Sequence, residues 1–396
     1  MASRGPDEGG PESFNPFDPE HFRDPYLRLE RLRASCPVAP VPHVGLFVAS
    51  DECARSALRD YERLSNEGNF VLEGGATQDE PSNIVQLDPP QHSRMRRLLL
   101  AAFTPDAVTQ LQPYIQSVAT GLVDGMKSEP RADIVNALAV PLPMAVLIRL
   151  VGVPEEGAAL FKEWTTEITA NLPDDFRKLP SWPAFKSYLQ TQIDSRRGAT
   201  NPPEDLLSRL LDATIDGERL TDAEIRMTVF QLIVAGFEST THLISNCVFE
   251  LLSTGQWARL RDDRDLVAAA VEESLRHDAP IEWVMRTVNT EHEMAGQPAH
   301  EGERVLIGLA AANRDPDRWE NPDEFDVDRE RSEEHLAFGH GIHLCLGASL
   351  ARAEAQIAIT ELVQAFPNLE LEPGFMFERL PSAMLRGPAR LDVRWT

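Results

Sequence analysis

Cysteine is scarce in this chain, and its spacing is wide. The 396 residues include four cysteines, Cys36, Cys53, Cys247 and Cys345, and no two of them form a CxxC pair. This pattern argues against a disulfide framework and against a structural zinc site. Free thiols are typical of a reducing compartment, so we expect a cytoplasmic protein.

Basic residues and long apolar runs are also in short supply. The chain has 38 Lys and Arg against 63 Asp and Glu, a net charge of −25. This balance argues against nucleic acid or an anionic membrane as the main partner. The most apolar stretch, residues 137–153, is broken by Pro141 and Pro143 and is too short to span a bilayer. Because the N-terminus lacks the apolar core of a signal peptide, we expect no membrane partner.

The periodicity of the chain predicts a mainly α fold with a small β portion. Residues 1–18 are acidic and rich in Gly and Pro, which predicts a flexible N-terminal arm before one large domain at 19–396. Helices are predicted at 25–35, 90–103, 106–126, 133–151, 156–170, 181–197, 204–213, 222–253, 266–278 and 346–365, and a helix is expected to begin at Ser50 or Asp51. Short strands and turns are expected at 45–49, 283–310 and 370–396, and a long loop at 62–88.

Cys345 lies in a glycine-rich stretch that runs into a predicted helix. Taken alone, a cysteine of an intracellular protein is most often a small buried hydrophobe. Gly339, Gly341 and Gly347 favour another interpretation, because glycine lets backbone N–H groups approach a ligand. Those groups and the positive end of the following helix would stabilise a thiolate, which is the form of cysteine that binds iron.

The same stretch resembles the haem-binding signature of the cytochrome P-450 family, in the pattern Phe338-Gly339-x-Gly341-x-His343-x-Cys345-x-Gly347. The resemblance implies a single large helical haem-thiolate fold, haem b (iron protoporphyrin IX) as the cofactor, and Cys345 as the iron ligand. Phe338 would cover the ligand side and exclude water. His343 would donate to a haem propionate, and Gly347 belongs to the same cofactor-binding loop.

A second motif lies within the long apolar helix predicted at 222–253. Glu238 beside hydroxyl residues is unusual there, because an unpaired buried charge is costly; a solvated face, or hydroxyls bonded to the preceding turn, is the alternative. The stretch resembles the oxygen-activation motif of the family and matches it at Ala235, Gly236 and Glu238. Ser239 stands where the family usually has Thr, and serine has a freer χ1.

The resemblance assigns roles to these residues. Gly236 and the preceding alanine would leave room for a diatomic ligand beside the haem. Glu238 and Ser239 would carry protons to it, and Thr240 could share that role. The serine leaves open how tightly electron use and product formation are coupled.

Two further motifs supply cationic groups for the haem carboxylates. His92 and Arg96 are four residues apart and share a helix face, so they could hold a carboxylate by charge-assisted hydrogen bonds. Ordinary capping and basic surface residues are the alternative. The stretch resembles the propionate-binding pattern of the family, and Arg286 with His343 is expected to clamp the second propionate.

Glu273 and Arg276 have the spacing of a helical ion pair. An exposed pair of this kind would be worth only a few tenths of a kcal/mol. The pair resembles the Glu-x-x-Arg motif of the family, which implies a buried pair that ties a core helix to the segment before the cysteine loop. The family often completes this network with Arg or His in a Pro-x-x-Phe stretch. Here that stretch, residues 322–325, offers Glu324, so the third partner stays open.

The resemblance implies a monooxygenase that inserts one oxygen atom of O₂ into a lipophilic small molecule. Electrons would come from a separate ferredoxin and ferredoxin reductase, and we expect a monomer. A haem-thiolate ligand-binding or sensor protein, and a peroxide-driven oxygenase, are the alternatives. The acid–hydroxyl pair in the long helix disfavours both.

The partner surface and the substrate pocket are predicted only coarsely. A basic patch of Arg94, Arg97 and Arg352 would meet an acidic ferredoxin. A mostly apolar pocket would accept an aromatic, a terpenoid, a steroid or a fatty acyl chain. Its predicted lining comprises the 62–88 loop, the 165–183 break, Val234, Ala235, Trp283, Val284, Met384 and Leu385.

Overall fold

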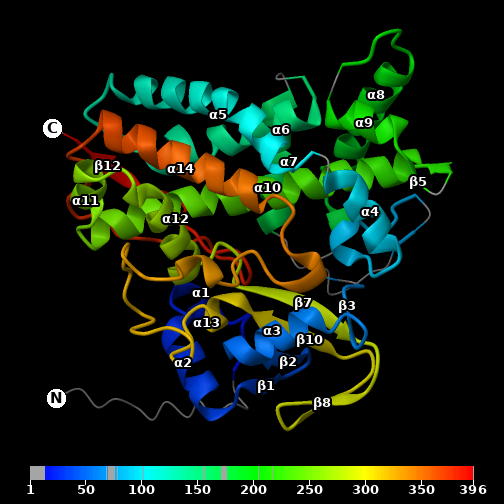
Figure 1. Cartoon of the computed structure of the whole chain (residues 1–396), viewed down its shortest axis with the longest axis horizontal. Helices are drawn as coiled ribbons and strands as arrows, with labels where there is room; N and C mark the ends of the chain where they lie inside the picture. Colours follow the sequence, from blue (N-terminus) through cyan, green and yellow to red (C-terminus); the bar gives the residue numbers. More distant parts are fainter. Residues whose placement is uncertain are drawn as a thin grey trace.

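The long helix α10 (Asp222–Ser253) lies at the centre of the molecule (Figure 1). Thr221 and Glu224 form a capping box at its start. Most of the residues in its second half are buried. In the computed structural model the described residues are 14–395, except for residues 68, 70–75, 78, 101, 155–156, 171–175, 204 and 216. The helix has the bounds that the sequence predicts.

Other helices pack around α10 and form the larger part of the molecule. Its main neighbours are α6 (Pro141–Val151), α7 (Ala158–Ala170), α12 (Leu266–His277) and α14 (Ala348–Ala365). The remaining helices of this body are α4 (Gln91–Leu100), α5 (Pro105–Met126), α8 (Trp182–Arg197), α9 (Leu206–Asp212) and α11 (Trp257–Asp262). One continuous apolar core joins these helices.

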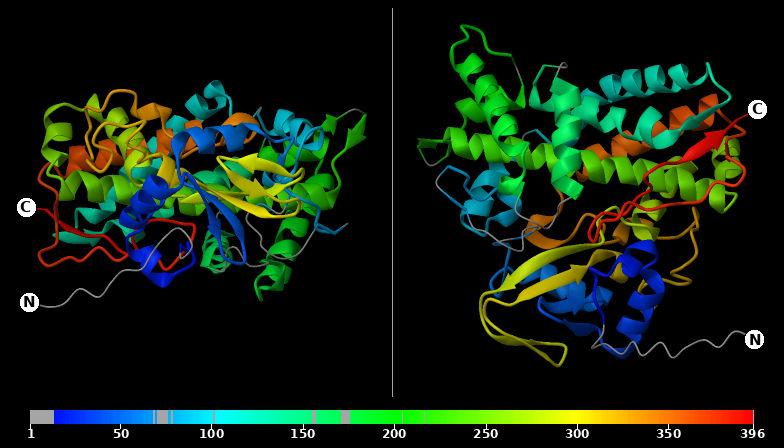
Figure 2. Two further views of the ribbon diagram at one scale, coloured as in Figure 1. Left: turned by 90° about the horizontal axis from the view of Figure 1, so that it is seen from below. Right: turned by 180° about the vertical axis from the view of Figure 1, so that it is seen from behind.

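A smaller β portion lies to one side of the helical body (Figures 1 and 2). Its five-stranded sheet has the order β1 (Val38–Val41), β2 (Gly45–Val48), β10 (Arg304–Gly308), β7 (Trp283–Val288) and β3 (Leu64–Ser65). Short helices flank it: α1 (Pro19–Arg23), α2 (Tyr26–Ser35), α3 (Asp51–Arg59) and α13 (Leu309–Ala312). The predicted mainly α fold with a small β portion is confirmed, and Ser50 caps α3 as expected.

The remaining strands pair in small groups; those within 283–310 and 370–396 were predicted from the sequence, and those at 131–133, 214–215 and 218–219 were not. β4 (Arg131–Asp133) pairs with β12 (Asp392–Arg394), which also pairs with β11 (Glu370–Leu371). Two two-stranded ribbons complete the strands: β5 (Thr214–Ile215) with β6 (Glu218–Arg219), and β8 (His292–Met294) with β9 (Gln297–Ala299). The helix predicted at 133–151 is a π-helical turn (Val135–Ala139) followed by α6, because Pro141 begins a new helix.

The predicted arm at 1–18 falls mostly outside the described residues. Residues 1–13 are not described, but Phe14 is buried and lies edge-on to Phe47 of β2, with 4.9 Å between the ring centroids. The packed domain therefore begins before the predicted boundary at residue 19. Among the described helices, none combines the length and the apolar character needed to cross a bilayer.

Candidate active site

The cysteine loop is held by its own backbone. The Cys345 N–H donates to the carbonyl of Phe338 at 2.9 Å, and Gly339 donates to Leu336 at 2.8 Å. Gly339 and Gly341 have φ of +71° and +74°, which glycine adopts without strain. A Cβ at Gly341 would lie 2.6 Å from a backbone oxygen of α3, so only glycine fits there. The loop brings the Cys345 sulfur to the wall of a cavity, just before α14.

Two opposing effects act on the Cys345 thiol. It lies deep in the protein, and burial raises its pKa; the backbone N–H groups of Gly347 and Ala348 and the cations of Arg96 and Arg352 act in the opposite direction. The residue is nevertheless accessible, and it lines the cavity. A metal ion bound to the sulfur would remove the thiol proton outright.

The cavity beside Cys345 collects most of the predicted site. It has a volume of about 1470 Å³ and lies between the cysteine loop and α10. We call it the larger cavity. The predicted site residues that line it are His92, Arg96, Ala235, Gly236, Ser239, Thr240, Arg286, Phe338, His343, Cys345 and Gly347. These residues come from four separate stretches of the chain, and the fold brings them to one cavity.

Two buried histidines at one end of this cavity are short of hydrogen-bond partners. Both ring nitrogens of His92 and Nε2 of His343 are buried without a hydrogen-bond partner among the described residues, and the two rings lie 4.0 Å apart. Burial lowers the pKa of His92 to about 4 and that of His343 to about 2. Burial also lowers the pKa of Arg286 to about 10. Because buried donors are normally paired, this end of the cavity fits the two carboxylates of haem.

The α10 wall carries the acid and the hydroxyls. The Ser239 hydroxyl donates to the carbonyl of Ala235 at 2.6 Å, the bond to the preceding turn that was the alternative interpretation. Its oxygen can still accept a hydrogen bond from the cavity side. Glu238 is 9% exposed and lines a second, contiguous cavity. A Cβ at Gly236 would lie 3.0 Å from Leu147, so glycine there also allows α6 to approach.

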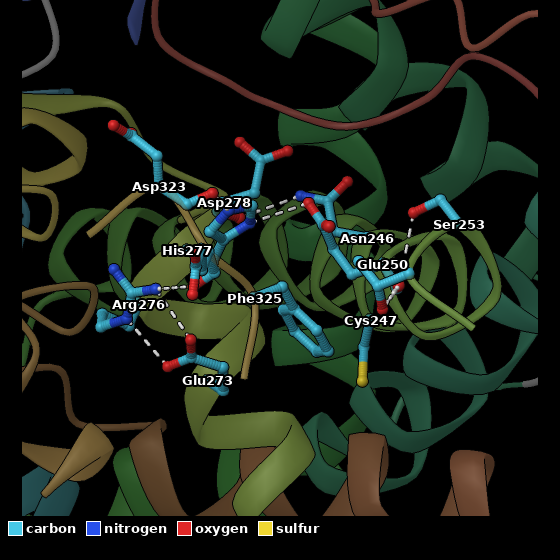
Figure 3. Close-up of polar contacts among 12 residues, drawn as sticks. Asn246, Cys247, Glu250, Ser253, Glu273, Arg276, His277, Asp278, Asp323 and Phe325 are labelled. Atoms are coloured by element: carbon cyan, nitrogen blue, oxygen red, sulfur yellow. Dashed lines mark hydrogen bonds and ion pairs between the residues drawn. The ribbon is translucent and has the colours of Figure 1, made fainter. Parts of the chain in front are cut away.

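The Glu273–Arg276 pair is buried, and its third partner is Arg329. Arg276 Nε and Nη2 donate to the Glu273 carboxylate at 2.8 and 2.7 Å, and both residues are at most 1% exposed (Figure 3). Arg329 Nε donates to the same carboxylate at 2.9 and 3.1 Å. The family pattern would place this partner at 322–325, where the sequence left it open. It lies four residues beyond Phe325, in an irregular segment with no periodic signal.

The second cavity is the candidate substrate pocket, and we call it the smaller cavity. It has a volume of about 640 Å³ and shares Ala235 and Ser239 with the larger one. Val234, Met384 and Leu385 line it as predicted. The predicted 62–88 loop contributes Asn69, Asn83, Val85 and Gln86, and the predicted 165–183 break contributes Ile168 and Phe176. Three lining residues were not predicted from the sequence: Phe230, Gln231 and Ile281. Gln231 lies one helical turn before Ala235 and follows Phe230, so the helical period indicates that both lie near the pocket.

Trp283 does not line either cavity, contrary to our prediction. It is fully buried, its Nε1 donates to the carbonyl of Ala383 at 2.8 Å, and its ring packs edge-on to Phe17. Val284, the next residue of β7, lines the larger cavity. Successive side chains of a strand point to opposite faces, so the two residues could not both face the pocket.

The comparisons with known proteins agree with this geometry. A family model described as Cytochrome P450 matches residues 168–259 and 256–385. Cytochrome P450 monooxygenase PikC from Streptomyces venezuelae is 40% identical over 389 residues, which cover 94% of this chain and 91% of that protein. The chain belongs to the cytochrome P450 family of haem-iron monooxygenases. The predicted family, fold class and enzyme class are therefore confirmed.

Solved structures share the whole architecture. P450BioI in complex with acyl carrier protein ligated with hexadec-9Z-enoic acid has a TM-score of 0.86 and 32% identity, and covers 95% of this chain and 99% of that one. CYP109E1 from Bacillus megaterium in complex with testosterone has a TM-score of 0.88 and 30% identity, and the match covers 96% of this chain and 100% of that one.

Proposed function

We propose that the protein is a haem-thiolate monooxygenase that inserts one oxygen atom of O₂ into a lipophilic molecule, with electrons from a separate ferredoxin system. One observation carries the proposal. A single cavity is lined by Cys345, by two histidines with ring nitrogens unpaired among the described residues, and by the hydroxyl face of α10. A ligand-binding protein would not need the acid–hydroxyl pair.

The residues around the larger cavity would hold haem b as follows. Cys345 would bind the iron, and Phe338 would keep water from the sulfur. His92 and Arg96 on α4 would hold one propionate, and Arg286 with His343 the other. Haem bound through a thiolate supplies the activation of O₂, because thiolate donation favours O–O cleavage.

Glu238 and Ser239 would move protons at the oxygen-binding face. The Ser239 hydroxyl can accept a proton from the Glu238 side and pass its own to the cavity. Thr240 is buried, lines the same cavity and could share the role. We expect Ser239→Ala to divert electrons to hydrogen peroxide. If the fraction of electrons used for product is unchanged in Ser239→Ala, Thr240 would carry the protons instead. Thr240→Val would then test that role.

The substrate would lie in the smaller cavity, against an apolar wall formed by Ile168, Phe176, Phe230, Met384 and Leu385. Apolar walls of this kind select lipophilic molecules. The acyl chain and the steroid in the two solved relatives support this class. A screen of apolar compounds for substrate-induced spin shifts would identify which molecular scaffold within this class the protein binds.

The ferredoxin would dock against α4, where Arg97 in the last turn is exposed and Arg94 is half-buried. Arg352 suits this role less well, because it donates to Glu272 at 2.6 and 2.8 Å and stacks over the Phe338 ring. Arg97→Glu should slow reduction and reduce its salt dependence. Action as a cytoplasmic monomer stays a prediction.

Replacement of the ligand tests the proposal most directly. Cys345→Ser should abolish the strongly red-shifted band of the carbon monoxide complex, because a thiolate ligand produces that band. Cys53→Ser, which changes a cysteine away from the cavity, should leave it intact. If the band survives in Cys345→Ser, the ligand assignment is wrong. Turnover with a surrogate ferredoxin, compared with hydrogen peroxide alone, separates the monooxygenase from the peroxide-driven alternative.

A further inference from the structure

His242 is a buried imidazole that the reaction described above does not use. It lies one turn after Glu238 on α10, is 1% exposed, and places Nε2 3.7 Å from Oε2 of Glu238. Neither ring nitrogen has a hydrogen-bond partner among the described residues. Leaving a buried polar group unpaired typically costs about 1–3 kcal/mol. A histidine kept under these conditions, beside the acid of the site, calls for a functional explanation.

The far side of the ring meets the C-terminal segment. A Cβ at Gly387 would overlap the ring at Nδ1, so glycine lets the backbone pass directly against it. Asp278 and Arg379 lie within electrostatic reach of the ring. Arg379 donates to Asp278 at 2.7 Å and has a side chain that is 16% exposed. Among the described residues, the charges that act on His242 are therefore Glu238 on its own helix, Asp278 and Arg379.

Neighbouring side chains hold Asp278 in place. Arg386 Nε donates to the Asp278 carboxylate at 3.0 Å, and Asn246, one turn after His242, donates to the Asp278 carbonyl at 3.1 Å (Figure 3). His242 therefore lies between an acid at the cavity wall and an ion pair that reaches the surface.

We propose that His242 supplies Glu238 with protons from the side of α10 that faces away from the cavity. The inference rests on the monooxygenase function proposed above. In this step the Nε2–H bond breaks as a bond from the proton to Oε2 of Glu238 forms. Nδ1 takes a proton from a hydronium ion on the Asp278–Arg379 side, which leaves water. No electrons move, and the ring is reset by exchange of its tautomers.

The chemistry of imidazole suits this task. Burial lowers the pKa of His242 to about 4, an effect that Asp278 opposes and Arg379 reinforces, so the ring is neutral at pH 7. A neutral imidazole has one donor and one acceptor nitrogen, and it can accept a proton at one as it gives a proton at the other. The 3.7 Å separation is longer than a hydrogen bond, as catalytic contacts often are before substrate binds.

Turnover of the holoenzyme with a surrogate ferredoxin gives the first test. His242→Asn keeps a polar side chain that can position Glu238 but cannot relay a proton. We expect about a tenfold loss of product formed per electron pair, with more hydrogen peroxide and a larger solvent deuterium isotope effect. Thr241→Val, a buried change on the same helix, is the matched control and should behave as wild type. If His242→Asn retains wild-type coupling and isotope effect, the relay is overturned.

An infrared titration of the resting holoenzyme gives a second readout that does not depend on turnover. The carboxyl band of Glu238 is assigned by its loss in Glu238→Gln. In His242→Leu an apolar side chain replaces the imidazole that lies 3.7 Å from the carboxylate, so the titration of the Glu238 carboxyl should move to higher pH. An unchanged titration overturns the inference even if the monooxygenase function stands. Absence of any product from the wild type would instead count against the proposed function.

Discussion

Two buried polar clusters in this molecule differ in how completely the protein satisfies them. In the Glu273–Arg276–Arg329 cluster, all five donors of the Arg276 guanidinium are used, two by the carboxylate of Glu273 and three by main-chain carbonyls. At the end of the larger cavity, neither nitrogen of His92 has a partner among the described residues. The first cluster is complete in itself and is structural. The second is left with unpaired ring nitrogens, as the proposed haem site requires.

The largest effect should follow from opening the complete cluster. Arg276→Ala leaves Glu273 buried with only Arg329 to balance it, and breaking a buried pair in this way typically costs about 3–5 kcal/mol. Urea denaturation would measure the loss. Arg259→Ala, which breaks the exposed pair with Asp328, is the control and should cost less than about 1 kcal/mol. Equal losses in the two variants would show that the buried cluster has no special role.

A smaller effect is expected from the third partner alone. Arg329→Ala removes a charge-assisted donor to Glu273 but leaves the Arg276 pair intact, so the free energy of unfolding should fall by about 2 kcal/mol. Arg331→Ala, two residues along and 66% exposed in its side chain, should change little. Indistinguishable urea midpoints for the two variants would remove Arg329 from the cluster.

The incomplete cluster should respond through the ligand instead of the fold. His92→Phe removes a donor to a haem carboxylate, and we expect haem to be released about tenfold faster. The free energy of unfolding of the haem-free protein should not fall, because His92 makes no hydrogen bond there to lose. Haem transfer to an acceptor globin measures the first quantity. His300→Phe, an exposed change, is the control. A haem-free His92→Phe protein that unfolds more readily than wild type would contradict the comparison.

The smallest effect concerns pH. Burial lowers the pKa of His242 to about 4, below the ordinary value of 6.5 that it regains on unfolding. Between these values the unfolded chain binds a proton that the folded chain does not, so stability falls as the pH falls. Between pH 7 and pH 5.5 this group should lower the free energy of unfolding of the wild type by about 1 kcal/mol. His242→Asn lacks the group and should not show this decrease. Urea denaturation of both proteins at both pH values would detect it. If the free energy of unfolding falls equally in both proteins, a hydrogen-bond acceptor must already stabilise the protonated ring in the folded state.

Local signals in the sequence determined several features correctly. The capping box at Thr221 and Glu224 and the apolar run after it gave α10 its bounds, because both act within a few turns of one helix. The glycines around Cys345 marked its loop for the same reason, since the backbone there needs positive φ at positions fixed by the local turn.

Features that depend on distant contacts could not be predicted in this way. The direction of Trp283 depends on the register of β7 within the sheet, and a shift of one residue would reverse it. The pairing of β4 with β12 joins residues more than 250 positions apart in the chain. Arg329 reaches Glu273 from an irregular segment, where side-chain direction follows no period.

The sequence alone determined the family, the helical framework and most of the candidate haem-site residues that the fold brings to the larger cavity, because short motifs with fixed spacing encode them. Only the tertiary structure decided which buried polar groups complete one another and which are left for a ligand. That decision depends on distances between segments far apart in the chain. A few ångströms separate a saturated ion pair from a donor without an acceptor, and no local pattern specifies those distances.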